Sequence, residues 1–453
     1  MQLVAYGAQD VYLTGQPKVT FFQAVYKRHT NFAMENIQQT VNGTPSNSGR
    51  VSVTIARNGD LVGNMYVALI PNPSSLILTS NNNSGYDTCW VAERAISAVE
   101  LTIGGQRIDK HYQNWFRLYA EVFLSESDKL NYGKMTSGLA ATADTATNKT
   151  YVYLPLLFFF NRNPGLYLPL IALQYHEVRL DFDLTANFTS YFGASSPVFE
   201  VWANYVYLDT EERRRFAQKG HEYLIEQVQH TGGDSLSGQQ NTVRLSFNHP
   251  VKELIWCYQN ANQSATANLN GMWNFSTGVS NVNVTSNVAY VQSLQCTQPH
   301  HAGSPMLWSN TAASGGLVGN TLQGAAWVEE GAPVFAAAAG TDRAAYEVGP
   351  LRDFKLILNG QDRFKEQVGK YFNQYQPYVY HSGTPYPGIY VYSFALQPEE
   401  HQPTGTCNFS RIDNAQVFFN LKNATTNLLQ KMFAVNYNIL RIQSGMGGLA
   451  FSN

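Results

Sequence analysis

Asp181 and Asp183, in the stretch "DFD", are the carboxylates whose spacing most suggests chemistry. Residues two apart on a strand lie on the same face, so this pair could hold a divalent metal like the DxD motif of a glycosyltransferase. A nucleotide-sugar site would also need a glycine loop that follows a strand and holds phosphate, and the sequence contains none. We therefore interpret the two aspartates as the polar face of a strand.

The histidines and cysteines show no spacing typical of a metal site or a nucleophile. No CxxC pair, HExxH motif or grouping of Ser, His and Asp is present, so solvated loop histidines and reduced, mostly buried thiols are expected. The sequence thus predicts no cofactor, no metal and no enzymatic activity. The residues concerned are His176, His230, His300, His301, His381, Cys89, Cys257, Cys296 and Cys407.

Asparagine followed two residues later by Ser or Thr is frequent, which in a secreted protein would indicate glycans. The N-terminus lacks a basic region, an apolar core and a small-residue cleavage site, so no signal peptide is expected. Three sequons lie in a long segment rich in Asn, Ser, Thr, Gly and Ala, at about residues 260–345, that we expect to project outward. Asn262, Asn274 and Asn283 are the candidate glycosylation sites.

The composition favours β-structure and assembly. The chain has 27 Tyr, 25 Phe and 35 Gly among 453 residues, which suits pleated, half-buried strands joined by tight turns. Charged residues make up 14%, against about 25% in an average soluble protein. A neutral polar surface reduces the desolvation cost when copies pack side by side. The net charge of −2 argues against a protein that coats DNA.

Several stretches predict the positions of individual elements. "VSVTIARNGDLVGNMYVALI" alternates around Asn58-Gly59, the signature of a hairpin. "QRIDKHYQNWFRLYAEVF" has apolar residues at helical spacing from Ile108 to Tyr119. "TEERRRFAQKG" (210–220) is the densest charge run and is interpreted as a solvated linker. No apolar run reaches the ~18 residues of a membrane span, so we expect a soluble protein made in a reducing cytoplasm.

The second half of the sequence repeats the pattern of the first. "LTIGGQRIDKHYQNWFRLY" (101–119) has its counterpart in "LILNGQDRFKEQVGKYFNQY" (356–375), and "HEVRLDFDL" in "AQVFFNL". In both halves a strand ends before Gly-Gln and an aromatic-rich, helix-spaced stretch follows. The order indicates a duplicated unit of about 200 residues that is nearly all β, as an eight-stranded, two-sheet jelly roll requires.

Five longer stretches together resemble the major capsid proteins of nucleocytoplasmic large DNA viruses, with mimivirus-like and marseillevirus-like capsids the most similar. They are "GAQDVYLTG" with "FFQAVYKRHTNFAMENI", "HPVKELIW", "YVYSFALQPEEHQPTGTCNFSRID" and "YNILRIQSGMGGLAF". The resemblance implies an all-β fold of two consecutive eight-stranded jelly rolls with short helical excursions and a short N-terminal arm. The expected division is 1–30 (arm), 31–209 (first jelly roll), 210–225 (linker) and 226–453 (second jelly roll).

The resemblance further implies a structural protein of the virion, assembled in the host cytoplasm. Three copies would form a capsomer with pseudo-sixfold outline, in contact with neighbouring capsomers and with minor capsid and penton proteins. The arm would lie under the capsomer and face the particle interior, with an inner viral membrane as a candidate partner and no sequence-specific contact to nucleic acid. Its contact residues would be Phe21, Phe22, Tyr26, Lys27 and Arg28.

A carbohydrate-binding or carbohydrate-modifying β-sandwich protein is the alternative. Exposed Trp and Tyr residues could stack on sugars, and "DFD" could hold a metal. Neither the duplication nor the charged linker is predicted by that function. A metal-binding double jelly roll of the cupin kind would need clustered His and Glu ligands, which the sequence lacks.

Overall fold

The computed structural model describes residues 30–71, 90–136, 151–193, 197–260, 275, 349–385 and 388–451. The expected arm, apart from Thr30, and nearly all of the expected outward loop lie outside these ranges. Within them no helix is long and apolar enough to cross a membrane. We call the described residues up to Asp209 the first half, and those from His221 onward the second half.

The first half consists of two antiparallel five-stranded sheets. Apolar side chains alternate along the strands toward the space between the sheets; on β9, Phe182 is buried and meets Phe199 of the other sheet edge-to-face at 5.4 Å. One sheet contains β1 (Phe32–Gln39), β10 (Phe199–Leu208), β4 (Leu61–Leu69), β7 (Val152–Pro155) and β8 (Leu168–Pro169). The other contains β2 (Val41–Asn42), β3 (Arg50–Thr54), β9 (Val178–Leu184), β5 (Ile96–Ile103) and β6 (Gln106–Tyr112).

The hairpin predicted around Asn58-Gly59 is wrong. β3 pairs with β2 and β9, whereas β4 pairs with β10, β7 and β8, so this turn carries the chain from one sheet to the facing one. Gly59 is needed because a Cβ there would lie 2.9 Å from Cβ of Tyr205 on β10. The Asp60 amide donates to the Val206 carbonyl at 3.0 Å, which fixes the turn on β10.

Tyr205 anchors this crossing, and replacing it by Phe should lower the free energy of unfolding by about 1 kcal/mol. Its side chain is fully buried, and its hydroxyl lies 2.6 Å from the Ala56 carbonyl and 2.9 Å from Oε1 of Gln39. Without the Tyr205 hydroxyl, an acceptor such as the Ala56 carbonyl loses its donor. Urea denaturation measures the loss. Tyr207→Phe, which removes an exposed hydroxyl that contacts Glu35, is the matched control and should change stability little.

Short helices connect the strands of the first half. The predicted helix from Ile108 begins only at Gln113, because residues 106–112 form β6 and pair with β5. The linker segment contains an exposed helix, α6, capped by the Asp209 carboxylate, which accepts from the Thr210 amide at 2.7 Å. The helices are η1 (Val91–Arg94), α2 (Gln113–Phe123), α3 (Glu126–Thr136), α4 (Phe159–Arg162), η2 (Pro164–Leu166), α5 (Phe188–Phe192) and α6 (Thr210–Gln218).

The second half is organised around one nine-stranded antiparallel sheet whose long strands bend. Its core is aromatic: Trp256 stacks on Phe354 at 4.5 Å, and both are buried. The strands are β11 (His221–Leu245), β12 (Pro250–Asn260), β13 (Leu351–Leu358), β14 (Gln361–Asp362), β15 (Gln367–Val368), β16 (Ile389–Ser393), β17 (Cys407–Asn408), β18 (Ala415–Gln443) and β19 (Met446–Leu449). The helical segments are η7 (Tyr371–Tyr375), α11 (Gln376–Tyr380) and η8 (Phe409–Arg411).

The repeated sequence segments occupy equivalent positions. Gly104-Gly105 joins β5 to β6, and Asn359-Gly360 joins β13 to β14, each through two residues with positive φ. Such two-residue turns match the twist of a hairpin. The next matched segments also correspond, because β9 pairs with β5 as the start of β18 pairs with β13. The structure therefore supports the duplication read from the sequence.

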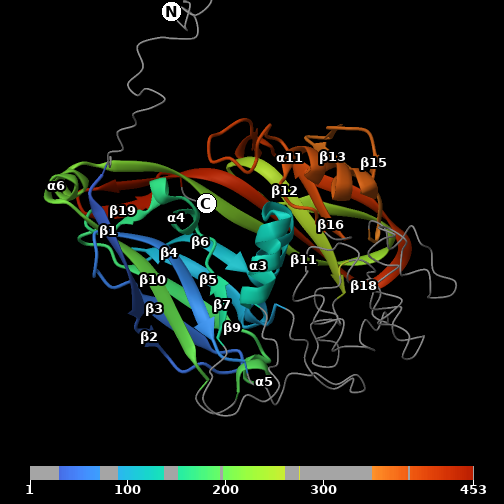
Figure 1. The fold of residues 1–453 in the computed structure, drawn as a ribbon. Helices are drawn as coiled ribbons and strands as arrows, with labels where there is room; N and C mark the ends of the chain where they lie inside the picture. Colours follow the sequence, from blue (N-terminus) through green and yellow to red (C-terminus); the bar gives the residue numbers. More distant parts are fainter. Residues whose placement is uncertain are drawn as a thin grey trace, which may run out of the picture.

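The strand pair β11–β18 links the halves. Figure 1 shows it running from the second half across the top of the first, toward α6 and β19. Its far end pairs His221 with Ile442 and carries buried Ile225, Phe433 and Leu440 into the core of the first half. The two halves consequently share apolar surface as well as a covalent link.

Candidate functional site

The most distinctive chemistry of the described residues is a set of buried polar contacts between the two halves, which we call the junction. Helix α2 forms one side of it. Asn114 donates to Oε1 of Gln259 on β12 at 3.1 Å, and Trp115 lies against Phe433 of β18 at 5.6 Å between ring centroids. One face of α2 thus packs on the second half, and its other apolar side chains pack in the core of the first half.

Strand β6 crosses β11 beside this helix. The Gln227 side chain donates to the Ile108 carbonyl, and the Val228 amide donates to Oδ1 of Asp109 at 3.2 Å. The other carboxylate oxygen of Asp109 lies 2.9 Å from Nε2 of His111, whose ring stacks on Phe158. A buried carboxylate therefore satisfies donors from both halves.

Glu226 of β11 is the centre of an ionic group at the junction. Its carboxylate lies 2.6 Å from Nζ of Lys252 on β12, 3.1 Å from Nη2 of Arg162 on α4 and 3.6 Å from Nδ1 of His401. Burial alone would raise the pKa of Glu226, but these cationic and hydrogen-bonding partners lower it to about 2. Glu226 is therefore ionised at neutral pH and joins α4 of the first half to the second half.

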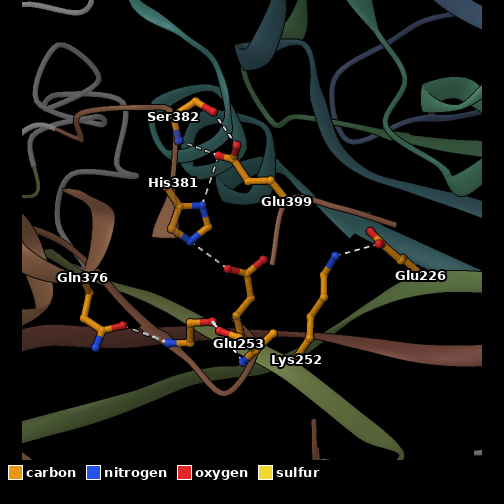
Figure 2. A network of polar contacts seen from close by, with 9 residues as sticks. Glu226, Lys252, Glu253, Gln376, His381, Ser382 and Glu399 are labelled. Atoms are coloured by element: carbon orange, nitrogen blue, oxygen red, sulfur yellow. Dashed lines mark hydrogen bonds and ion pairs between the residues drawn. The ribbon is translucent and has the colours of Figure 1, made fainter. Parts of the chain in front are cut away.

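His381 lies between two carboxylates, as Figure 2 shows. Its Nε2 is 2.9 Å from Oε2 of Glu253 on β12, and its Nδ1 is 3.3 Å from Oε1 of Glu399. Burial would lower the pKa of His381, yet the two carboxylates outweigh it and raise the pKa to about 9. The ring edge also faces Phe123 at the end of α2, at 5.2 Å between centroids, so a buried imidazolium contacts the first half.

The residues after His381 dock on the first half through their backbone. The Gly383 amide donates to the Val122 carbonyl of α2 at 3.1 Å, and Nζ of Lys129 on α3 donates to the Thr384 carbonyl at 2.8 Å. A Cβ at Gly383 would lie 2.5 Å from the Val122 carbonyl oxygen, so only glycine allows this approach. We call residues 381–385 the latch.

A second ionic group lies under the latch, within the first half. Arg117 places its guanidinium 3.9 Å from the ring centre of Trp90, 2.9 Å from Oε1 of Glu121 and 3.4 Å from Oε1 of Glu93. Burial raises the pKa of Glu93 although Arg117 and the Tyr132 hydroxyl oppose the shift. Lys129 connects this group to the latch, since its Nζ is also 3.8 Å from Oε2 of Glu121.

These contacts are suited to holding the halves together rather than to catalysis. The side chains of His381, Glu253, Arg117 and Glu121 are at most 1% exposed, so no substrate reaches them in this conformation. Burial raises the pKa of the Cys257 thiol to about 12, which keeps it protonated and a poor nucleophile. Among the residues the structure describes, no group of three or more His, Cys, Asp or Glu side chains is arranged to hold a metal.

Both aspartates of the "DFD" stretch form salt bridges with arginines. Oδ1 of Asp183 accepts from Arg50 at 2.6 Å, and Asp181 lies 2.7 Å from Arg179. The polar strand face predicted from the sequence is what the structure contains. Arg213 of the charged run likewise pairs with Asp60 at 3.0 Å.

The residues proposed from the sequence for the arm and for glycosylation lie outside the described ranges. They are Phe21, Phe22, Tyr26, Lys27, Arg28, Asn262, Asn274 and Asn283. The sequence interpretation missed the junction and was wrong for His381 and His230, both expected to be solvated loop histidines. His230 lies on β11, and its ring packs against Tyr112 and Phe433. One signal was available: the adjacent charges of Lys252 and Glu253 interrupt an otherwise apolar strand sequence, "PVKELIWCY".

Comparison with known proteins covers almost the whole chain. Residues 20–209 match the family model described as the major capsid protein N-terminus, and residues 212–448 match that of the large eukaryotic DNA virus major capsid protein. The major capsid protein of Paramecium bursaria Chlorella virus 1 is 42% identical over 100% of this chain and 99% of its own. Capsid protein 1 of Acanthamoeba polyphaga mimivirus is 32% identical, also over 100% of this chain and 99% of its own.

Solved structures agree. The chain in the quasi-atomic model of the PBCV-1 virus capsid superposes with a TM-score of 0.71 at 38% identity, covering 96% of this chain and 100% of that one. The Faustovirus major capsid protein shares the fold with a TM-score of 0.62 at 13% identity, covering 97% and 94%. The all-β fold class of two successive jelly rolls with short helices is confirmed.

Proposed function

The chain belongs to the large eukaryotic DNA virus major capsid proteins, and on this premise we propose that three copies associate into a capsomer with pseudo-sixfold outline. Its role is structural, with capsomers tiling an icosahedral shell. Three chains that each carry two similar barrels present six similar lateral faces, so one polypeptide fills a hexagonal lattice. The junction carries this proposal. A pseudo-hexagon needs the two barrels of each chain at a fixed relative position. Here Arg162 of the first half pairs with Glu226 of the second, and Asn114 and Lys129 donate hydrogen bonds across the junction.

The low charge of the chain supports lateral packing. With 14% charged residues, the sides of a trimer meet neighbours through neutral polar groups, and many weak contacts add up across a shell. We propose 31–209 and 226–453 as the two jelly rolls, with 210–225 as the connection between them. Within the connection, helix α6 has no buried residue.

The further partners are proposed from the family resemblance. Neighbouring capsomers surround each trimer, and minor capsid and penton proteins bind at its base and at the vertices. The arm, residues 1–30, contributes Phe21, Phe22 and Tyr26 to packing beneath the capsomer and points Lys27 and Arg28 to the interior, toward an acidic membrane surface or a minor protein. Assembly takes place in the host cytoplasm, and the protein resides in the virion.

Native mass spectrometry of the purified chain tests the proposal. The expected species has three times the 50.5 kDa mass of the chain, and negative-stain images should show hexagonal outlines. A monodisperse monomer at micromolar concentration would contradict it. Specific binding on a glycan array, without trimers, would instead favour the carbohydrate-binding alternative.

A further inference from the structure

The latch joins the second half to the first through backbone hydrogen bonds of Gly383 and Thr384, and it begins with a titratable side chain, His381. It follows α11, and its first residue, His381, is enclosed by Glu253 below, Glu399 above and Phe123 at its edge. Figure 2 shows the imidazole aligned between the two carboxylates. Glu399 also accepts hydrogen bonds from the amide and the hydroxyl of Ser382, so the carboxylate and the latch fix each other.

The charges that face His381 come from a small number of elements. β12 supplies Glu253, and the segment after β16 supplies Glu399, which is 27% exposed; Phe123 of α2 brings no charge. Lys129 and Glu121 lie at the other end of the latch, beyond Thr384. On the neighbouring strands Lys252 is paired with Glu226, whose carboxylate also lies near Arg162 and His401. Tyr437 of β18 lies near both Glu226 and Glu253.

We propose that His381 is a protonation-dependent clamp that holds the latch on α2 near neutral pH and releases it at alkaline pH. Loss of the proton leaves a neutral imidazole, which can donate to only one of the two carboxylates. Neither carboxylate then has a cation beside it, which costs most for Glu253 because its side chain is fully buried. The latch contacts of Gly383 and Thr384 are released as a consequence, and the two halves lose one of their connections.

The direction of the pH dependence follows from the shifts. The pKa of His381 rises from 6.5 to about 9, so its contribution is complete below 6.5 and is lost as pH rises through 9. The pKa of Glu399 is lowered despite burial, by hydrogen bonds from His381 and Ser382, so its contribution is present above 4.5 and lost on acidification. The clamp is closed between these limits.

Hydrogen–deuterium exchange of the full-length chain tests the proposal. After correction for the intrinsic rate, the opening of residues 381–385 should increase on the order of ten- to a hundredfold between pH 7 and pH 10. In His381→Gln the segment should be open at both values, with no such increase. His221→Gln, which alters a histidine bonded to the Phe216 carbonyl at the end of α6, is the control and should behave like the unaltered chain.

Three outcomes would overturn the clamp: no increase in the unaltered chain, an increase that persists in His381→Gln, or an equal effect of His221→Gln. Should His381→Gln fail to fold, Glu399→Gln decides, because losing one carboxylate must shift the opening to lower pH. That opening of the latch would loosen a capsid subunit rests on the proposed function, whereas the hydrogen–deuterium exchange measurement does not depend on it. Native mass spectrometry at pH 7 reports trimers separately, so failure of the clamp and failure of trimer formation are distinguishable.

Discussion

Replacing Lys252 by methionine is expected to lower the free energy of unfolding by about 3–5 kcal/mol at pH 7. The Lys252 side chain is 1% exposed, and its Nζ is 2.6 Å from Oε1 of Glu226. Methionine fills similar volume, but it leaves a buried carboxylate that is ionised because its partners lower its pKa to about 2. The junction would then hold an incompletely compensated charge. Urea and thermal denaturation, followed by tryptophan fluorescence, measure the loss.

Two further variants show whether burial is the cause. Lys355→Met breaks a pair with Asp362, which is 50% exposed, and should cost only about 0–1 kcal/mol. The double variant Glu226→Gln with Lys252→Met removes the stranded charge and should recover part of the lost stability. If Lys252→Met and Lys355→Met have the same effect, the ionic group around Glu226 does not stabilise the junction.

The sequence predicts local features such as turns, but it does not predict which strands, distant in sequence, pair with each other. Gly104-Gly105 and Asn58-Gly59 are equally good turn signals, yet only the first closes a hairpin. The difference lies in Tyr205, distant in sequence, which packs under Gly59 and fixes the crossing between sheets. Turn residues specify a change of direction, whereas the partner of the following strand is decided by packing.

The start of α2 illustrates the same limit. Ile108, Tyr112, Trp115 and Tyr119 fit helical spacing, but the first two also fit the alternation of a strand, and pairing with β5 decides for the strand. The repeat, in contrast, was visible from the sequence, because order and turn residues are preserved where identity is low.

The junction itself was not predictable. Glu226 is 64 residues from Arg162, and His381 is 128 residues from Glu253 in sequence, as their numbers show. A single sequence offers no rule that pairs charges at such separations. Only the two adjacent charges in β12 signalled that polar groups enter the core. The family and the fold follow from local sequence patterns, whereas the contacts that join the halves depend on residues far apart in sequence.

Replacing Arg117 by methionine should have an effect as large as that of the Lys252 substitution, about 3–5 kcal/mol. Arg117 is fully buried against Trp90 and lies within 3.4 Å of both Glu93 and Glu121. Without the guanidinium, the two buried carboxylates lose the cation they share, and Lys129 beside Glu121 and Arg94 near Glu93 compensate their charges only in part. The substitution should also weaken the latch. Uncompensated carboxylates would attract Lys129 more strongly, and its hydrogen bond to the Thr384 carbonyl would weaken.

The pH dependence of this variant identifies its cause. Burial already raises the pKa of Glu93, and removing Arg117 raises it further. A carboxyl group whose pKa is higher in the folded state binds a proton on folding, so it favours the folded state below that pKa and disfavours it above. The stability loss of Arg117→Met should therefore be smaller at pH 5 than at pH 8. Arg441→Met, which breaks an exposed pair with Glu222, should show little loss at either pH. An Arg117→Met loss that is equal at both pH values would mean that lost packing on Trp90, and not stranded charge, explains the effect.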